Sequence, residues 1–368
     1  MDTSLVSART IGTFCRVDGD HLGKIYKNVL SGYREWDQLG HASEWVLFPQ
    51  NLGPRDAIDE TVIGGEVYTI VSNRDAHGKK GSIVAIIKGT RADEVCAILE
   101  KIPKEEREKV EEVTMDLSES MRCISERAFP KAMVVIDLFH LIKDAVEAVE
   151  ETRMKAKRAE VAKQKRQEKE WNAKQAASKR RRKAYRKKHP KKYEGRKRGV
   201  KPKYEGRFRP PTLDNGDTEV ELLTRSKYLV SRSGEKWSER QKNRAKILFE
   251  KHPKIKETHG LLCSLRSIFS SKTANRDDGR RKLHEWYGNV AACTSREMKT
   301  VRDTIKSREE HVLNYFVNRA TNASAESLNS KLKSFRTQLR GISNLPFFLF
   351  RLVRVMGWMG HPPTELCQ

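Results

Sequence analysis

Three carboxylates stand far apart in this chain, each in or beside a segment with regular secondary-structure character. Asp59 lies in the β-rich run AIDETVI, and Asp116 ends the β-rich run VEEVTMD. Glu326 lies near the start of ASAESLNSKLK, where apolar residues recur at helical spacing. If the fold brings these acids together, they can hold divalent metal ions, because Mg²⁺ prefers hard carboxylate oxygens and keeps several of its waters.

The chemistry that such a site supports is phosphodiester cleavage without a covalent intermediate. This reaction requires a water or a 3′-hydroxyl that is activated near neutral pH, and it requires stabilisation of the charge on pentacovalent phosphorus. Two Mg²⁺ or Mn²⁺ ions about 3.5–4 Å apart meet both requirements. We therefore predict that Asp59, Asp116 and Glu326 are catalytic residues and metal ligands.

Each carboxylate alone has a simpler interpretation, as a solvated turn residue or as the ion-pair partner of a nearby lysine. Glu60 also competes with Asp59, because successive strand residues point to opposite faces of a sheet. The joint occurrence of three acids in suitable elements favours a site. Asp137 and His140, in the motif DLFH, are accessory candidates that could assist the metal site or orient the DNA strand. The alternative is that Asp137 starts a helix and that His140 packs against it.

The elements that would position the acids follow one another between residues 57 and 139. Three β-rich runs, AIDETVI, VYTIVS and SIVAIIK, are joined by glycine-containing turns and predict an antiparallel meander. The helical segments RADEVCAILEK and SESMRCISERAF then alternate with the runs VEEVTMD and AMVVIDLF. The order βββαβαβ is that of an α/β, RNase H-like core with a mixed sheet. In that fold the first and fourth strands are neighbours, so Asp59 would meet Asp116.

The helix that carries Glu326 has two chemically different sides. Its apolar stripe consists of Leu328, Leu332, Phe335 and Leu339. Glu326 lies on the polar side, and an apolar stripe packed on the core could deliver this acid to the edge of a sheet. Four basic residues of the same segment could hold DNA phosphate beside it: Lys331, Lys333, Arg336 and Arg340.

Most of the net charge of +25 lies between Lys155 and Arg209, which contains 25 Lys and Arg residues against 5 Asp and Glu residues. A tract this basic binds a polyanion by releasing counterions from a phosphate backbone. The alternative is a solvated linker or basic helix without a dedicated partner. The residues that we expect to bind DNA here are Arg180, Arg181, Arg182, Lys187 and Lys188.

Composition changes along the chain predict four segments. They are an N-terminal extension of short helices and loops (1–50), the first part of the core (51–145), a mostly helical insertion (146–310) with a basic, partly disordered tract (155–211), and the C-terminal helices of the core (311–368). The six cysteines form no CxxC pair and no zinc-finger spacing, which favours reduced thiols in a bacterial cytoplasm. There is no signal-peptide pattern and no membrane-spanning run, so we expect a cytoplasmic, nucleoid-associated protein without a membrane partner.

Four segments carry a family resemblance: IDET, VTMD, FPKAMVVIDLFHLIKDAVEAVEETR and NRATNASAESLNSKLKSFRTQLRGISNLPFFLFRL. Over about residues 50–355 the chain resembles the ISL3-type insertion-sequence DDE transposases, most closely the ISAon1-like group. The resemblance implies an RNase H-like core interrupted by a helical insertion before the Glu-bearing helix. It implies catalytic roles for Asp59, Asp116 and Glu326, and it matches Asp137 and His140 to an accessory D-x-x-H signature. The implied reaction is metal-dependent cleavage at the element's ends and transfer of the 3′-hydroxyl into target DNA.

The chain departs from many members of that family because no zinc ribbon or helix-turn-helix is evident before Asp59. The resemblance therefore implies a separate DNA-binding subunit from an upstream reading frame, and analogy suggests a homodimer. Two other functions compete. One is an inactive or repurposed transposase that only binds DNA, against which the intact acid triad argues. The other is a basic RNA- or ribosome-associated protein, which the lack of an RNA-module signature disfavours.

Overall fold

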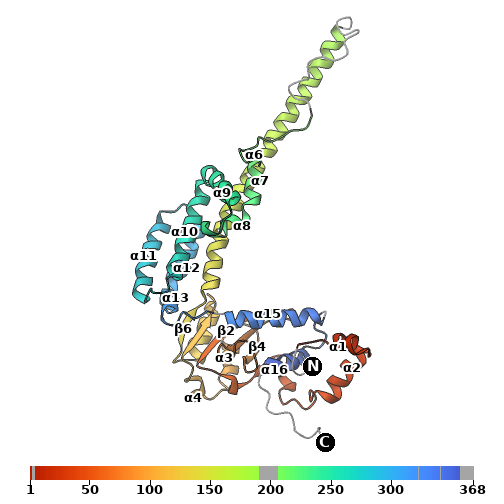
Figure 1. Cartoon of the computed structure of the whole chain (residues 1–368), viewed down its shortest axis with the longest axis vertical. Helices are drawn as coiled ribbons and strands as arrows, with labels where there is room; N and C mark the ends of the chain where they lie inside the picture. Colours follow the sequence, from red (N-terminus) through yellow and green to blue (C-terminus); the bar gives the residue numbers. More distant parts are fainter. Residues whose placement is uncertain (2–4, 190–205, 322, 340, 357–368) are drawn as a thin grey trace. The chain divides into compact units, whose positions relative to one another are not determined.

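The computed structural model describes residues 1, 5–189, 206–321, 323–339 and 341–356. The chain forms two compact units (Figure 1). The first, here called the sheet unit, is assembled from residues 1–141, 273–280 and 305–368, and the second, the helical unit, from residues 142–272 and 281–304. None of the helices in the described ranges is both long enough and apolar enough to cross a membrane.

The sheet unit is built on a six-stranded mixed sheet, which confirms the predicted mixed α/β class. The strands are β1 (Trp45–Leu47), β2 (Arg55–Ile63), β3 (Glu66–Asn73), β4 (Ile83–Lys88), β5 (Glu112–Met115) and β6 (Met133–Ile136), and their order in the sheet is β1-β4-β3-β2-β5-β6. The predicted meander is confirmed, because β2, β3 and β4 pair antiparallel. The two later strands run parallel to β2 at the other side of the sheet.

The N-terminal residues contribute one strand that the sequence does not predict. Residues 1–50 read as short helices and loops, yet β1 pairs antiparallel with β4, with Trp45 opposite Ile87. Three residues are too few to show a period-two pattern. The strand forms because β4 offers a free edge and because Val46 and Leu47 are buried there.

Two short helices precede this strand and pack closely together. They are α1 (Ala8–Cys15) and α2 (Gly19–Ile25), and three residues with Arg16 in the left-handed region connect them. A Cβ on Gly12 would lie only 2.6 Å from the Cα of Gly19, so this approach depends on glycine. The sequence shows no helix-turn-helix before Asp59, but the structure places a helix pair with a three-residue turn there.

Helices and short helical turns connect and cover the strands of the sheet unit. After α2 come η1 (Tyr26–Leu30), η2 (Leu39–His41), η3 (Pro49–Asn51), α3 (Ala92–Leu99), α4 (Lys104–Arg107), α5 (Glu119–Ala128), α13 (Glu309–Leu313), α14 (Tyr315–Asn318), α15 (Ala323–Gln338) and α16 (Leu345–Met356). The predicted helical segments RADEVCAILEK and SESMRCISERAF correspond to α3 and α5. Hydrogen bonds from Asn314 to the Val134 carbonyl (2.7 Å) and from Asn318 to Glu112 (2.9 Å) tie the segment before α15 to β6 and β5.

The predicted apolar stripe of α15 is part of the main core of this unit. Leu328, Leu332 and Phe335 are buried, Leu339 packs against them partly exposed, and the Phe335 ring stacks on Phe348 of α16 at 5.1 Å. The same cluster includes Tyr33 and Trp36 from the N-terminal residues and Tyr68 from β3. The stripe therefore fixes α15, and Glu326 with it, against the sheet.

Truncation of this core should destabilise the sheet unit strongly. Phe335→Ala is expected to lower its free energy of unfolding by about 3–5 kcal/mol, because a large buried ring is replaced by a cavity. Urea unfolding followed by near-UV circular dichroism measures the change. Lys333→Ala, an exposed site on the same helix, should stay within about 0.5 kcal/mol of wild type. Equal midpoints for the two variants would contradict the packing described here.

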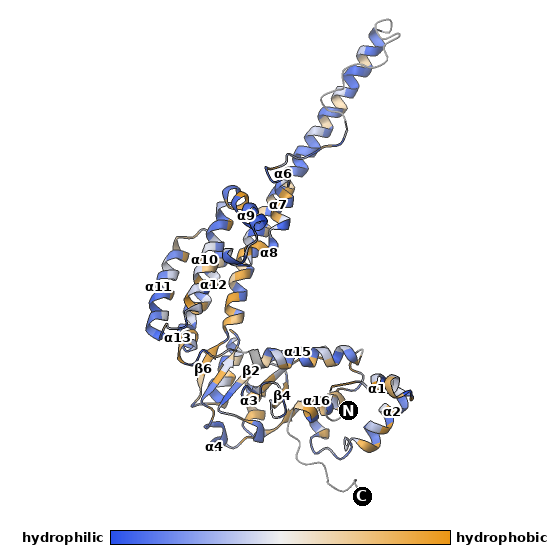
Figure 2. Cartoon of the chain, in the orientation of Figure 1, coloured by the Kyte–Doolittle hydropathy of each residue, from blue (hydrophilic) through white to orange (hydrophobic). Residues whose placement is uncertain are grey.

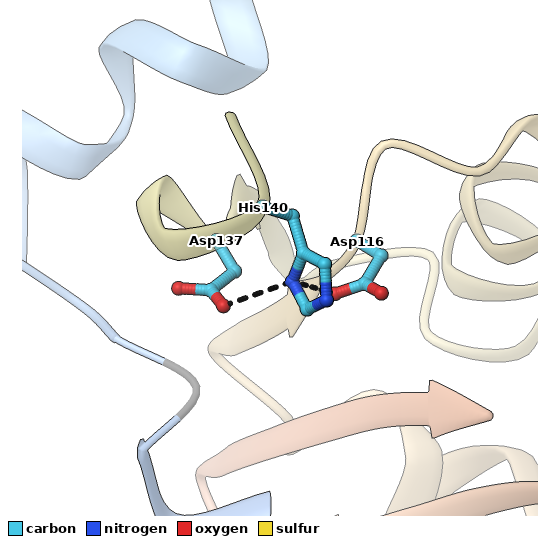
Figure 3. A group of neighbouring side chains, drawn as sticks. All are labelled: Asp116, Asp137 and His140. Carbon is cyan, nitrogen blue, oxygen red and sulfur yellow. Dashed lines mark hydrogen bonds and ion pairs between the residues drawn. The ribbon is translucent and has the colours of Figure 1, made fainter. Parts of the chain in front are cut away.

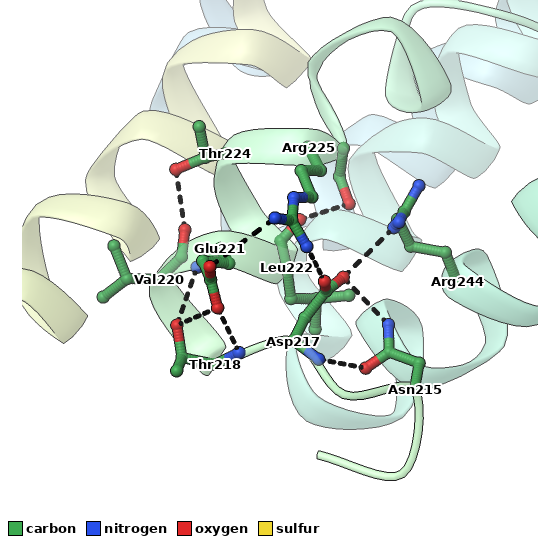
Figure 4. Close-up of polar contacts among 10 residues, drawn as sticks. Asn215, Asp217, Thr218, Val220, Glu221, Leu222, Thr224, Arg225 and Arg244 are labelled. Atoms are coloured by element: carbon green, nitrogen blue, oxygen red, sulfur yellow. Dashed lines mark hydrogen bonds and ion pairs between the residues drawn. The ribbon is translucent and has the colours of Figure 1, made fainter. Parts of the chain in front are cut away.

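The helical unit contains α6 (Leu138–Lys188), which begins in the sheet unit, and the shorter helices that follow it. These are α7 (Glu219–Arg225), α8 (Lys227–Val230), η5 (Gly234–Lys236), α9 (Glu239–Lys251), α10 (Pro253–Ser270), α11 (Arg276–Ala292), which begins in the sheet unit, and α12 (Arg296–Ser307), which ends in it. The buried carboxylate of Asp217, just before α7, is the centre of a hydrogen-bond network (Figure 4). It accepts hydrogen bonds from Arg225 of α7, from Arg244 of α9 (3.4 Å) and from Asn215 (3.0 Å). This network joins α7 to α9.

Helix α6 is longer than the sequence predicts. Residues from Ala184 onward are expected to be partly disordered, but the helix continues to Lys188, because Ala, Lys, Arg and Gln are strong helix formers. From Met154 to His189 none of its side chains is buried, and hydrophilic residues dominate this stretch (Figure 2). Of the rest of the predicted tract, residues 190–205 lie outside the described residues, and residues 206–211 are described and lie outside the helices and strands. A helical stretch this polar, whose side chains all stay at least partly exposed, is accessible to a charged partner.

Candidate active site

The pairing of β2 with β5 brings the first two acids to the same level of the sheet. The two strands run parallel with Ala57 opposite Thr114, and continuing this register by two residues places Asp59 opposite Asp116. Asp59 is buried, with 7% of its surface exposed, whereas Glu60 is exposed. Strand alternation therefore points Asp59 and Glu60 to opposite faces of the sheet, and Asp59 lies on the buried face.

Asp116, Asp137 and His140 form a compact cluster (Figure 3). Asp116 follows β5, Asp137 connects β6 to α6, and His140 lies in the first turn of α6. The Nδ1 atom of His140 lies 2.6 Å from Asp116 Oδ1 and 3.2 Å from Asp137 Oδ2. These two hydrogen-bonded carboxylates raise the pKa of His140 to about 10 in spite of its partial burial. The imidazole is thus protonated at neutral pH and balances part of the negative charge.

The structural interpretation of DLFH holds, and the accessory role of Asp137 and His140 stays a prediction. Asp137 Oδ1 accepts a hydrogen bond from the backbone N–H of Phe139 (3.3 Å), so this residue does start α6 as an N-cap. Its other oxygen faces His140. The ligand atoms of Asp116, Asp137 and His140 all lie within 4.8 Å of one another, which is close enough for one metal ion if it displaces the proton of His140.

The Asp59 carboxylate is held by two donors and is crowded by other acids. Its Oδ2 accepts a hydrogen bond from the side-chain amide of Asn329 at 2.6 Å, and its Oδ1 accepts one from the backbone N–H of Glu60 at 2.8 Å. Burial, and then the negative charge of Asp116, raise the pKa of Asp59 to about 6. The sequence places Asn329 on the polar side of the helix with Glu326, three residues further on, but the prediction gave it no role at the site.

Glu326 joins the same group from α15. Burial raises the pKa of its carboxyl, and the charges of Asp137 and Asp116 raise it further, so the structure couples Glu326 electrostatically to the other acids. Its Oε1 and the Oδ1 of Asn329 are buried and accept no hydrogen bond from the residues that the structure describes. Carboxylates that raise one another's pKa, with unpartnered oxygens among them, are the donor set that a hard divalent cation satisfies. The residues therefore fit Mg²⁺ or Mn²⁺.

The predicted DNA-binding residues within the described ranges lie on α15 and at the end of α6. One of these residues, Lys331, has a hydrogen-bond partner within the protein. Lys331 donates a hydrogen bond from Nζ to the carbonyl of Gly78 at 2.7 Å. Lys333 and Arg336 are exposed on α15, while Arg340 lies outside the described residues. The other five predicted residues are exposed on the last turns of α6: Arg180, Arg181, Arg182, Lys187 and Lys188.

Comparison with protein families gives a match that spans most of the chain. The family model DDE_Tnp_ISL3, which is described as "Transposase", matches residues 57–352, a range that begins before Asp59 and ends after Glu326. A search of curated proteins and a search of solved structures each found no significant match.

Proposed function

We propose that this chain, which belongs to the ISL3 family of transposases, cuts DNA at the ends of an insertion sequence by DDE chemistry and joins the 3′-hydroxyl to target DNA. The observation that supports this proposal most strongly is the convergence of acids from three separate elements. Asp59 comes from β2, Asp116 from the end of β5 and Glu326 from α15. The charge of Asp116 contributes to the raised pKa of both Asp59 and Glu326.

The sheet supports an RNase H-like assignment for the catalytic core. Strands β4, β3 and β2 form an antiparallel meander, and β5 and β6 extend it in parallel on the side of β2. We infer that residues 51–145 and 311–368 form this core and that residues 146–310 are the insertion. In this assignment β1 is an additional edge strand.

In the proposed mechanism Asp59, Asp116 and Glu326 would hold the metal ions. Two bound Mg²⁺ or Mn²⁺ ions would lower the pKa of the attacking water or 3′-hydroxyl and would stabilise charge on the phosphorus. The protein's own groups set the geometry of that site. Asn329 orients Asp59 through its 2.6 Å hydrogen bond, and His140 lies between Asp116 and Asp137, 2.6 Å and 3.2 Å from their oxygens, and so holds both carboxylates in place.

The proposal is tested by strand cleavage of labelled DNA that contains the element's own ends. The assay uses Mg²⁺ or Mn²⁺, with and without the product of an adjacent upstream frame, and Glu326→Gln as the control. Metal-dependent cleavage that disappears in the control supports the mechanism. Binding without cleavage in every condition would favour the second candidate, a repurposed DNA-binding protein, whose supporting observation is the exposed basic end of α6.

The finer assignments are part of the same proposal. They are membership of the ISAon1-like group, dependence on a separate DNA-binding subunit, a homodimer that cuts two ends together, and a cytoplasmic, nucleoid-associated location. Stimulation of cleavage by the upstream product would support the separate subunit. Full activity without it would assign recognition of the ends to this chain, where the α1–α2 helix pair would be the first segment to test.

Asn329 offers a test of positioning around the metal site. Asn329→Ala is expected to weaken Mn²⁺ binding and cleavage about 10–100-fold, because groups that orient a ligating carboxylate have effects of this size. Electron paramagnetic resonance of free Mn²⁺ measures the affinity independently of cleavage. Ser330→Ala, the exposed neighbour on the same helix, is the matched control. If the two variants bind Mn²⁺ equally well, Asn329 has no positioning role.

A further inference from the structure

An exposed aromatic ring lies directly beside the acid cluster. Phe139 is the second residue of α6 and stands in the chain between Asp137 and His140, with 58% of its surface exposed. Among the phenylalanines in the described ranges, only Phe139 and Phe14 are exposed. Single exposed apolar residues are common on protein surfaces, so exposure alone assigns no role. The position of Phe139 among charged groups is what distinguishes it.

Two contacts hold Phe139 next to those charged groups. Its backbone N–H donates a hydrogen bond to Asp137 Oδ1 at 3.3 Å, and its ring centroid lies 5.5 Å from that of His140. The two rings meet at 88°, edge to face, so the imidazole does not cover the phenylalanine as a stacked ring would. The imidazole itself lies 2.6 Å from Asp116. A single side chain therefore separates the Phe139 ring from the Asp116 carboxylate.

The Phe139 ring takes no part in the apolar core below α6. Lys143, four residues later, is exposed as well, and residues four apart share one side of a helix. Phe139 thus lies on the solvent side of α6. The buried residues in the first turns of this helix follow a different stripe: Leu141, Ala145, Ala148 and Val149. The ring is therefore accessible to a ligand that approaches the acids.

We propose that Phe139 stacks on the base of a nucleotide next to the scissile phosphate and so positions the strand that is cut. The inference rests on the proposed function, which places that phosphate at the acids. Such a phosphate has a nucleotide on each side, and an aromatic ring matches the flat, weakly polar face of a base. Every base has a π-face, so the contact tolerates any sequence. In a duplex the base must first leave its stack, and stacking on Phe139 would offset that cost.

The first test removes the ring and the base separately and together. Phe139→Ala should slow single-turnover cleavage of element-end DNA about 10–100-fold, because stacking of a base on an aromatic ring contributes on this scale. Phe139→Trp, which keeps an aromatic face, should retain the activity. The comparison is repeated on two DNAs that lack the base on one or the other side of the scissile phosphate. On one of them Phe139→Ala should cleave as fast as wild type, because the two changes remove the same contact.

The abasic DNAs distinguish stacking from a structural role of the ring. If Phe139 only supports the fold or the position of His140, the variant should be equally slow on all three DNAs. That result, or a variant without any defect, would overturn the proposal. Phe14→Ala is the matched control, since it truncates the other exposed phenylalanine, which lies on α1, and it should cleave like wild type.

The second test detects the base without cleavage. Glu326→Gln is bound to DNA that carries 2-aminopurine at either position next to the scissile phosphate, because this base analogue fluoresces more strongly when it leaves the base stack. Binding should brighten the probe at one position, and the additional change Phe139→Ala should remove most of that increase. Equal fluorescence with and without the ring would overturn the proposal. Cleavage that survives in Glu326→Gln would instead reject the proposed function.

Discussion

Asp59→Asn, Asp116→Asn and Glu326→Gln are each expected to reduce strand cleavage by at least about a thousandfold, equivalent to about 4 kcal/mol of transition-state stabilisation. Each change keeps the size of the side chain and removes the negative charge that holds a metal ion. The loss should be large because, in the proposed site, the three acids hold the same metal ions, so two of them cannot replace the third. A single-turnover assay with labelled element-end DNA measures the effect directly.

Glu60→Gln is the matched control for this prediction. It lies in the same strand as Asp59 but is exposed, so cleavage should stay within a few-fold of wild type. DNA binding without metal should be nearly unchanged in all four variants, and circular dichroism should confirm that they fold. If Glu60→Gln abolishes cleavage and Asp59→Asn does not, the assignment of the two neighbours is reversed.

The second large effect concerns the basic end of α6. Replacement of Arg180, Arg181, Arg182, Lys187 and Lys188 by Gln should reduce the salt slope of DNA binding by up to about 4.5, because five phosphate contacts at about 0.9 each would be lost. Gln preserves helix propensity, and none of the five side chains is buried, so the fold should be unaffected. Anisotropy titrations between low and physiological salt measure the slope.

The control removes an equal charge from cations that already have acidic neighbours. Lys104, Lys109, Arg127, Lys131 and Lys242 each lie beside a carboxylate, so a polyanion gains less from them. Their replacement by Gln should change the slope much less. A slope that is unchanged by the α6 substitutions would show that this helix is a solvated segment without a part in DNA binding.

Much of the sheet could be predicted because its determinants are local. The strands of the meander are β-rich runs between glycine turns, and the neighbourhood of β2 and β5 follows from the order of the elements. The apolar stripe of Leu328, Leu332 and Phe335 could also be predicted, because burial of one helix face imposes a helical period on the apolar residues. Strand β1 was missed because its formation depends on the free edge of β4, which no local pattern records.

The finer structure of the site could not be predicted for a related reason. The hydrogen bond between Asn329 and Asp59 depends on the rotation and depth of α15 against β2, and these are set by packing far from either residue. The hydrogen bond from Lys331 to the Gly78 carbonyl has the same origin. Residue types indicated which groups could act, whereas tertiary packing decided which of them meet.

The assembly of the sheet unit from three stretches of chain has a consequence for the timing of activity. Asp59 and Asp116 emerge early in translation, but Glu326 and the core residues of α15 and α16 follow only after the whole helical unit has been made. At about 5–20 residues per second this interval is on the order of tens of seconds. Throughout it, the nascent protein lacks the third acid and the helix that fixes it. If the proposed site is correct, a prematurely terminated product should be unable to cut DNA, because the third acid is made last.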